Sequence, residues 1–387
     1  MQTAARVKVI HVVTRLDFGG AQQNTLYTAG HLDPQRFDAV VASGPGGTMG
    51  EEVAASFGVE KRVLIPSLAR EVRPGQDLLA LLQLINLFLS ERPQVVHTHS
   101  SKAGILGRIA ARLAGVPVVV HTYHGFGFND FQPPRTKALY VALERLCARF
   151  CQAIVFVSRA NQDYARRHGI GRPERYRLIR SGVQLSRFPA PVADRDARKA
   201  QLGFGRHKLL VTTIGNLKPQ KNPGDFVAMA QKVNAKLPET EFCFVGDGPL
   251  RSRIEYQVIA SGLGGRFKLA GWRPDAAELL ALSDVFVLTS LWEGLPRALV
   301  EAMKSGLPCV CYATDGVADV LTDGVNGFCL PQGNVSSLAD RVIQLLEDET
   351  LRRKLGAEAA RSIGPEFDID GMVRAQEALY DELLGAV

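Results

Sequence analysis

Two glutamates and a proline in the second half of the chain have a spacing that suits an elongated polar ligand. Glu293 follows an apolar run typical of a strand, and Pro296 suits the first turn of a helix. Glu301 would then lie inside that helix, about two turns from Glu293. Ionised carboxylates only accept hydrogen bonds, so the two could hold hydroxyl groups, while unpaired N–H groups at the helix start could receive an anion. An ordinary capped helix with one exposed glutamate would have the same pattern.

Two further loops carry residues that suit a phosphate group. Gly19 and Gly20 lie between an expected strand and an expected helix, where a bare backbone can approach an anion closely. Lys218 and Lys221 precede another expected helix, and an ammonium group there is well placed to neutralise a diphosphate. No G-x-G-x-x-G follows any expected strand, so this is not the dinucleotide-binding fingerprint. A tight turn and a solvated loop are the alternative interpretations.

Histidine and cysteine do not indicate a metal site. The 8 histidines and 6 cysteines show no zinc-type ligand spacing, so no bound metal is expected, and the cysteines are expected to fill cores. His97 and His99 alternate along one expected strand and therefore share a face. We expect His97 to be structural, whereas His99 stays open between a structural role and a place in a ligand cleft.

The elements that must position these residues alternate between strand and helix in both halves of the chain. Short runs that are apolar on both faces predict parallel strands covered by helices. The expected strands are 8–14, 38–43, 62–66, 95–100, 116–123, 153–158, 176–180, 209–215, 241–246, 267–271, 285–290, 308–312 and 327–330. Helical patterns between them include 76–89, 136–150, 225–237 and 338–346. Because ligands of such sheets bind at the carboxyl ends of the strands, the loops named above are where a site is expected.

We therefore expect two α/β, Rossmann-like domains with parallel sheets, facing each other across a cleft. The 387 residues fit two domains of ordinary size. The expected parts are an N-terminal domain at 1–187, a linker rich in proline and charge at 188–207, a C-terminal domain at 208–364, and a final helix at 365–387 that packs back on the N-terminal domain.

Positive charge is concentrated in one stretch of the chain. The net charge is +7, but residues 100–187 carry 15 Lys and Arg against 4 Asp and Glu, whereas residues 1–99 balance at 9 each. Such asymmetry predicts an anionic partner, namely nucleic acid, an anionic membrane surface or a phosphorylated substrate. Nucleic acid is the least favoured, because no module that binds it is recognised. The longest apolar run is too short for a bilayer and no signal peptide opens the chain, so we expect a cytoplasmic protein.

Beyond these patterns, the chain resembles a known family. Glu293 and Glu301, separated by seven residues, resemble the signature of retaining nucleotide-sugar glycosyltransferases with the GT-B architecture, in particular family four (group 1). The resemblance spans essentially the whole chain and includes, in order, segments 19–21, 181–183, 245–250, 269–272, 313–316 and 326–328. Segments 97–104 and 121–126 resemble the branch that builds bacterial exopolysaccharides or lipopolysaccharides.

The resemblance implies a hexosyltransferase that moves a hexose-type sugar from a nucleotide diphosphate sugar, with UDP favoured, to a hydroxyl of a lipid-linked or saccharide acceptor. It implies retention of configuration, a front-face transfer with the leaving phosphate as base, and no obligatory cofactor. The catalytic residues implied are His124, Lys221 and Glu293. The donor-binding residues implied are Gly19, Gly20, Asn216, Lys221, Gly246, Trp272, Arg273, Gly294, Leu295, Pro296 and Glu301. A packed loop histidine is the alternative for His124.

Three positions depart from the family pattern. Ser181 replaces the common asparagine and Gln184 the common aspartate, and the third position is 216. Asn216 stands where the family usually has arginine, so one cation of the expected diphosphate clamp is missing. Lys221 must then carry more of that role, with help from Lys218 or Arg15.

The resemblance also suggests which anionic partner the basic stretch at 100–187 binds. A lipid-linked acceptor carries a diphosphate and lies at an anionic membrane, so we expect peripheral contact at the inner face of the plasma membrane. The acceptor and membrane side is expected to include His99, Lys102, Arg108 and Arg112. The arginines expected to dock are Arg108, Arg112, Arg145, Arg149, Arg166 and Arg167. Solvated helix faces are the alternative.

Two other functions would fit the same architecture. A nucleotide-sugar 2-epimerase would convert the donor without an acceptor. A non-catalytic subunit that binds nucleotide sugars is the second, and Asn216 is the feature that keeps it open.

Overall fold

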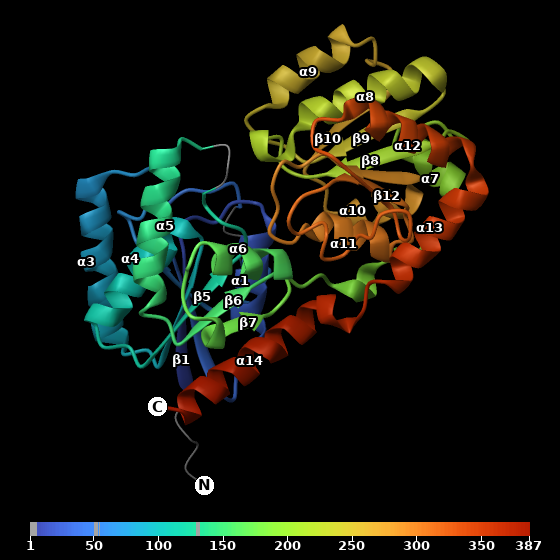
Figure 1. The fold of residues 1–387 in the computed structure, drawn as a ribbon. Helices are drawn as coiled ribbons and strands as arrows, with labels where there is room; N and C mark the ends of the chain where they lie inside the picture. The colour runs from blue at the N-terminus through green and yellow to red at the C-terminus, as the bar shows by residue number, and fades with distance from the viewer. Residues whose placement is uncertain (1–5, 50–52, 54, 129–131) are drawn as a thin grey trace. The chain divides into compact units, whose positions relative to one another are not determined.

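The structure is a computed structural model that describes residues 6–49, 53, 55–128 and 132–387. It divides into two compact units, each built on its own sheet (Figure 1). Unit 1 comprises residues 1–182 and 369–387, and unit 2 comprises residues 183–368. The division therefore falls at 182 and 368 rather than at the expected 187 and 364.

Unit 1 is built on a seven-stranded parallel sheet in the order β3-β2-β1-β4-β5-β6-β7. The strands are β1 (Val7–Val13), β2 (Phe37–Ser43), β3 (Lys61–Leu64), β4 (Val95–His99), β5 (Val118–Tyr123), β6 (Ala153–Phe156) and β7 (Tyr176–Leu178). The strand order steps outward from β1 in both directions, so the loops after β1 and β4 lie side by side at the carboxyl edge.

Helices cover both faces of this sheet. One face packs against α3 (Pro74–Glu91), α4 (Ser101–Leu113), α5 (Pro134–Ala148) and α6 (Arg159–Arg167). The other face packs against α1 (Gly20–His31) and α14 (Ile369–Gly385), which is the last helix of the chain. The final helix thus belongs to the core of unit 1, where Met372, Val373 and Tyr380 are buried.

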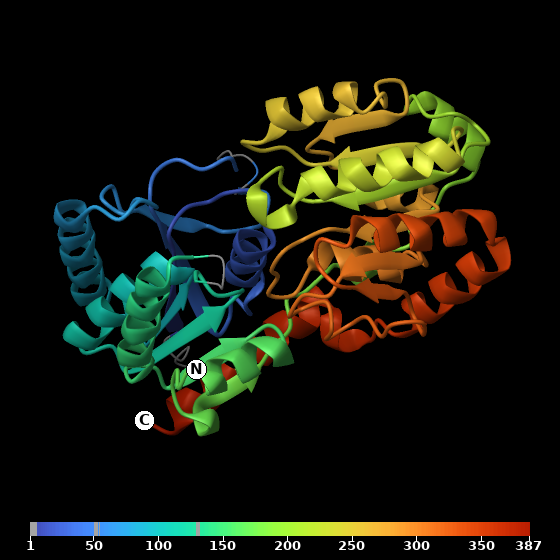
Figure 2. The same ribbon diagram turned by 45° about the horizontal axis from the view of Figure 1, so that its top comes forward.

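Unit 2 is built on a six-stranded parallel sheet in the order β10-β9-β8-β11-β12-β13. The strands are β8 (Leu210–Ile214), β9 (Glu241–Val245), β10 (Phe267–Gly271), β11 (Val285–Leu288), β12 (Cys309–Tyr312) and β13 (Phe328–Leu330). The helices are α7 (Arg195–Gln201), α8 (Pro223–Lys236), α9 (Arg251–Ala260), α10 (Ala276–Leu282), α11 (Arg297–Lys304), α12 (Val335–Glu347) and α13 (Glu349–Arg361). Figure 2 shows α8 and α9 beside the strands that they cover.

The stretch expected to be a linker at 188–207 contains α7, which is anchored on unit 2. Arg198 forms two hydrogen bonds with the carboxylate of Glu278, at 2.6 and 2.8 Å. The buried Lys199 contacts Asp284 at 3.3 Å. This stretch is therefore part of unit 2 rather than a linker. Among the helices of the described ranges, none is both long and apolar enough to cross a membrane.

Candidate active site

Two neighbouring strands of unit 2 bring Lys221 and Glu293 together. Lys221 closes a short 3-10 turn (Pro219–Lys221) after β8, and Glu293 lies in the loop after β11. Because β8 and β11 pair in the sheet, their carboxyl ends meet although the two residues are 72 positions apart. Nζ of Lys221 donates a hydrogen bond to Oε1 of Glu293, and the two side chains are only 17% and 8% exposed. This is an ammonium group held at the edge where ligands of parallel sheets bind.

Hydrogen bonds hold the two loops in register. The hydroxyl of Thr289 donates to the carbonyls of Lys221 and Asn222, at 2.9 and 3.0 Å. Nε2 of Gln220 donates to the carbonyl of Trp292 at 2.8 Å. Thr289 and Gln220 were not among the residues expected from the sequence, and their only signal there is their place beside the expected motifs. Because these hydrogen bonds already order the two loops, ligand binding would cost little additional loop entropy.

The start of α11 lies beside this ion pair in the chain. Gly294, Leu295 and Pro296 are buried, and no side chain caps the helix start. Glu301 lies one turn inside α11, where its Oε1 is 3.8 Å from the Arg297 guanidinium. Burial raises the pKa of Glu301, and Arg297 opposes that shift. The start of α11 is thus uncapped, and Glu301 lies inside this helix as expected.

The loop after β9 makes a backbone contact that only glycine permits. Gly246 has φ +135°, and a Cβ there would lie 1.9 Å from the carbonyl oxygen of Gly215. Its N–H donates to Gly271 at 2.8 Å. Trp272 follows and is 39% exposed. The guanidinium of Arg273 donates two hydrogen bonds to the carboxylate of Asp275, at 2.7 and 2.6 Å. A ligand that bound Arg273 would therefore share this guanidinium with Asp275.

In unit 1 the glycine pair opens a helix as expected. Gly19 is the N-cap residue of α1 and Gly20 its first residue. Arg15, the suggested substitute cation, forms an ion pair with Asp17 at 2.9 Å. Lys218 precedes the 3-10 turn that ends in Lys221.

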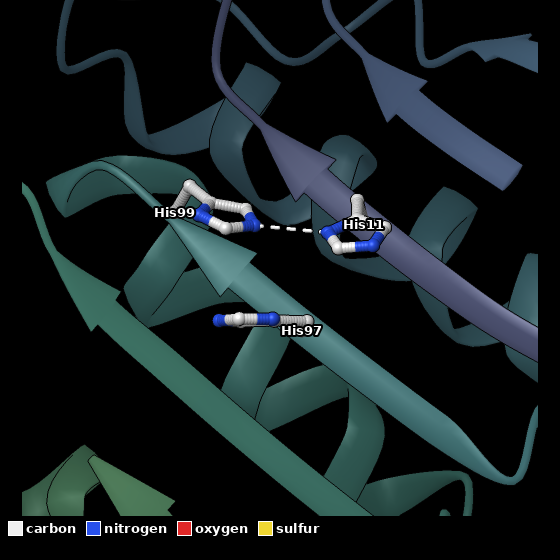
Figure 3. A group of neighbouring side chains, drawn as sticks. All are labelled: His11, His97 and His99. Carbon is white, nitrogen blue, oxygen red and sulfur yellow. Dashed lines mark hydrogen bonds between the residues drawn. The ribbon is translucent and has the colours of Figure 1, made fainter. Parts of the chain in front are cut away.

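A chain of hydrogen-bonded imidazoles runs from the sheet of unit 1 to its carboxyl edge. His11 on β1 and His99 on β4 contact through Nδ1 and Nε2 at 3.1 Å (Figure 3). His99 in turn contacts Nε2 of His124 through its Nδ1, also at 3.1 Å. His11 and His99 are buried, so burial lowers the pKa of His11 to about 3 and that of His99 well below its ordinary value. The sequence argument missed His11, whose signal was a polar ring inside an apolar strand.

His97 occupies both of its ring nitrogens with hydroxyl groups. Nδ1 contacts the Tyr380 hydroxyl at 2.6 Å and Nε2 the Thr122 hydroxyl at 2.7 Å. The ligand nitrogens of His11, His97 and His99 lie within 4.8 Å of one another, so neutral imidazoles that could hold a metal do gather here. A metal would have to displace one of the two hydroxyl partners of His97. We therefore interpret the group as a hydrogen-bonded network, with His97 in the structural role expected for it.

A small cavity in unit 1 reaches the end of this network. His99, His124, Arg180 and Ser181 line it together with side chains of α1 and α14. Arg180 was not among the expected site residues, although it directly precedes the segment 181–183 that resembles a family block. The cavity places a cation and two imidazoles around one small space.

The expected role of Arg108 in docking is wrong. Arg108 is fully buried, its Nη2 donates to Glu144 at 2.5 Å, and its Nε donates to Gly104 at 2.7 Å. Tyr123 donates to the same carboxylate at 2.6 Å. Lys102 is also engaged, because it pairs with the Asp77 carboxylate. Arg112, at the end of α4, is exposed.

Known protein families match both halves of the chain. The family described as glycosyl transferases group 1 matches residues 194–362, and the family described as glycosyltransferase family 4 matches residues 18–187. A UDP-Gal:α-D-GlcNAc-diphosphoundecaprenol α-1,3-galactosyltransferase of Escherichia coli is 33% identical over 90% of this chain and 90% of its own.

Solved structures have the same fold. HepE of Anabaena, solved with UDP and glucose, has a TM-score of 0.82 at 20% identity and covers 97% of this chain and 100% of its own. WaaG, a glycosyltransferase involved in lipopolysaccharide biosynthesis, has a TM-score of 0.77 at 16% identity and covers 96% of this chain and 99% of its own.

Fold and sequence together define a GT-B glycosyltransferase. The chain belongs to the glycosyltransferases of group 1, family 4, and the predictions of family, fold class and enzyme class are confirmed.

Proposed function

We propose that the enzyme transfers a hexose-type sugar from a UDP-sugar to a hydroxyl of a lipid-linked saccharide, with retention of anomeric configuration, during synthesis of a cell-surface polysaccharide. The observation that carries the donor half of this proposal is the Lys221–Glu293 ion pair at the carboxyl edge of the unit 2 sheet. The Escherichia coli relative supports the rest, since its name describes a UDP-sugar donor and a diphosphoundecaprenol-linked acceptor.

Lys221 is assigned to the donor diphosphate. An ammonium group has three N–H donors, and Glu293 uses one of them. The other two can bind phosphate oxygens, and the start of α11 adds positive potential. Glu293 keeps the ammonium in place and, as an acceptor, also suits a sugar hydroxyl. Glu301, one turn inside α11, is assigned to the ribose hydroxyls.

The reaction itself needs no residue that bonds to the sugar. The bond between the anomeric carbon and the phosphate oxygen breaks, and a bond from that carbon to the acceptor oxygen forms on the same face. The proton of the acceptor hydroxyl passes to the leaving phosphate oxygen. Lys221 stabilises the charge that develops on this oxygen, and one such preorganised donor contributes about 10²–10³ in rate.

His124 is assigned to the sugar side in unit 1. Its Nε2 is engaged with His99, which fixes how the ring is turned. Arg180 lies on the same cavity as His99 and His124, and its charge suits an anionic part of the substrates. The acceptor diphosphate would place the enzyme in peripheral contact with an anionic membrane.

A transfer assay with purified enzyme tests the proposal. Candidate UDP-sugars are incubated with a diphosphoundecaprenol-linked saccharide, and the product is isolated for NMR of the new linkage. We expect an extended lipid-linked product whose anomeric configuration matches that of the donor. Inversion would contradict the retaining step. Interconversion of the sugar nucleotide without acceptor would favour the 2-epimerase instead.

A further inference from the structure

Helix α3 carries a continuous apolar stripe on the side that faces away from the core. Leu78, Leu79, Leu82 and Leu89 are between 53% and 58% exposed. Their spacing of three, four and seven residues puts them on one side of the helix. None of the exposed residues of α3 is charged. The opposite side fills the core with Ala80, Leu84, Leu87 and Phe88.

Helices α4 and α5 also expose leucine side chains, and they expose arginines as well. Leu139 and Leu146 on α5 and Leu113 on α4 are also strongly exposed. The exposed charged residues at these helices are all basic, namely Arg112, Arg135, Arg145 and, directly after α5, Arg149.

The acidic side chains of these three helices are each paired with a cation. Glu91 pairs with Lys8 at 2.6 Å, and Asp77 pairs with Lys102. Glu144 is buried against Arg108. Over α3, α4 and α5, all fully described, exposed charge is thus of one sign.

The three helices form one layer. All three pack against the same core on one face of the unit 1 sheet, α3 packs on α4, and α4 packs on α5 (Figure 1). Their outward sides therefore point away from the same sheet. We call the exposed leucines and arginines of these helices the α3–α5 surface.

We propose that the α3–α5 surface docks on an anionic lipid bilayer, with α3 lying along the membrane plane and its leucines inserted among the lipids. Apolar side chains bordered by cations are the combination that binds such an interface, because the leucines leave water and the arginines meet lipid phosphates. At about 1.5 Å per residue, the stripe from Leu78 to Leu89 extends along about 17 Å of α3. This inference rests on the proposed lipid-linked acceptor, whose diphosphate lies at the same membrane surface.

A second copy of the chain is a poorer occupant. A two-fold interface would bring the same surface of two copies together, so arginines would face arginines with no exposed acid on these helices to pair with them. A bilayer of anionic lipid fits better, because it offers both negative charge for the arginines and an apolar interior for the leucines.

Vesicle co-sedimentation of the full chain, without donor or acceptor, tests the proposal. Wild type is expected to bind vesicles of phosphatidylcholine with phosphatidylglycerol and to release as salt is raised. Leu79→Gln with Leu82→Gln should weaken binding about tenfold or more. Arg135→Gln with Arg149→Gln should weaken it by about fivefold per arginine. Ile259→Gln, which changes an exposed side chain of unit 2, should bind as wild type does.

The melting temperature of each variant checks that it folds, and transfer to a water-soluble acceptor checks the active site. Equal binding by wild type and the leucine variant would overturn the proposal. The proposal would also be overturned if wild type were a dimer and the leucine variant a monomer that still bound vesicles as wild type does. Because binding is measured without substrates, an enzyme that docks but fails to transfer would contradict the proposed function alone.

Discussion

At the residue scale, the Lys221–Glu293 pair explains how a carboxylate can sit in a site for a diphosphate. Alone, Glu293 would repel the phosphates. Bound to the Lys221 ammonium, its charge is balanced, and the lysine is held where it can still donate to a ligand. Asn216, in place of the usual arginine, makes this single cation more important.

Glu293→Gln tests this arrangement. The amide keeps the size of the side chain but removes the charge that holds Lys221. We expect kcat to fall by about 10²-fold, while UDP binds at least as tightly because a negative charge near the phosphates is gone. Steady-state kinetics and UDP titration measure the two effects. Glu255→Gln on α9 is the matched control, and an unchanged kcat in Glu293→Gln would contradict the role.

The imidazole network predicts how stability depends on pH. Burial lowers the pKa of His11 to about 3, so protons bind the unfolded chain first as pH falls below 6.5. The free energy of unfolding should therefore decrease from pH 6.5 toward 3. His11→Gln removes one such proton, so its pH dependence should be shallower by about 1.4 kcal/mol per pH unit. Urea unfolding at several pH values measures this. The exposed His207→Gln should behave as wild type, and equal slopes for His11→Gln and wild type would exclude a buried neutral His11.

At the element scale, polar contacts fix how helices attach to the unit 1 sheet. The buried Arg108–Glu144 pair joins α4 to α5, and Tyr123 on β5 completes it. Tyr380 on α14 reaches His97 on β4. These contacts join segments that lie far apart in the sequence, so each holds one helix to the rest of the unit.

Glu144→Gln should destabilise the protein by about 3–5 kcal/mol, because it leaves the Arg108 charge buried without a counter-charge. Asp163→Asn, which breaks an exposed pair with Arg166, should change stability by at most about 0.5 kcal/mol. Chemical unfolding of both variants gives the comparison. If both variants changed the free energy of unfolding equally, Arg108 would have to be solvated rather than buried.

Tyr380→Phe should cost about 1–3 kcal/mol, since it leaves Nδ1 of His97 buried without its hydroxyl partner. Tyr256→Phe removes a hydroxyl from a highly exposed ring and should be neutral. Thermal unfolding distinguishes the two. A neutral Tyr380→Phe would show that the hydrogen bond between Tyr380 and His97 does not stabilise unit 1.

These elements also show what the sequence could and could not predict. Each expected strand overlaps an observed one. Strands buried on both faces are read directly from their apolar runs, whereas β3 is an edge strand that is mostly exposed. The family resemblance implied that Lys221 and Glu293 both belong to the site, but the ion pair between them was not predicted. The burial of Arg108 was not predicted either, because its partner Glu144 lies 36 residues away and an arginine on a helix is usually exposed. The contact between His11 and His99 was also missed, because the two residues lie 88 positions apart.

At the scale of the whole molecule, the two units carry different parts of the proposed reaction. Unit 2 holds Lys221, Glu293 and Glu301, which are assigned to the donor, and unit 1 holds the imidazole network, the small cavity and the α3–α5 surface. The chain passes between units at 182 and 368, and Val183 and Asp368 form a β-bridge beside both crossings. The final helix is therefore needed by unit 1 although it follows unit 2 in the chain.

The most direct test of the account is calorimetric titration of UDP into wild type, Lys221→Gln and Lys236→Gln. Lys236 is an exposed lysine of the same unit that pairs with Glu347, so it controls for lost charge. We predict that wild type and Lys236→Gln bind UDP equally and that Lys221→Gln binds at least about tenfold more weakly. Equal binding by all three proteins, or no binding of UDP by wild type, would contradict the assignment of Lys221 to the donor diphosphate.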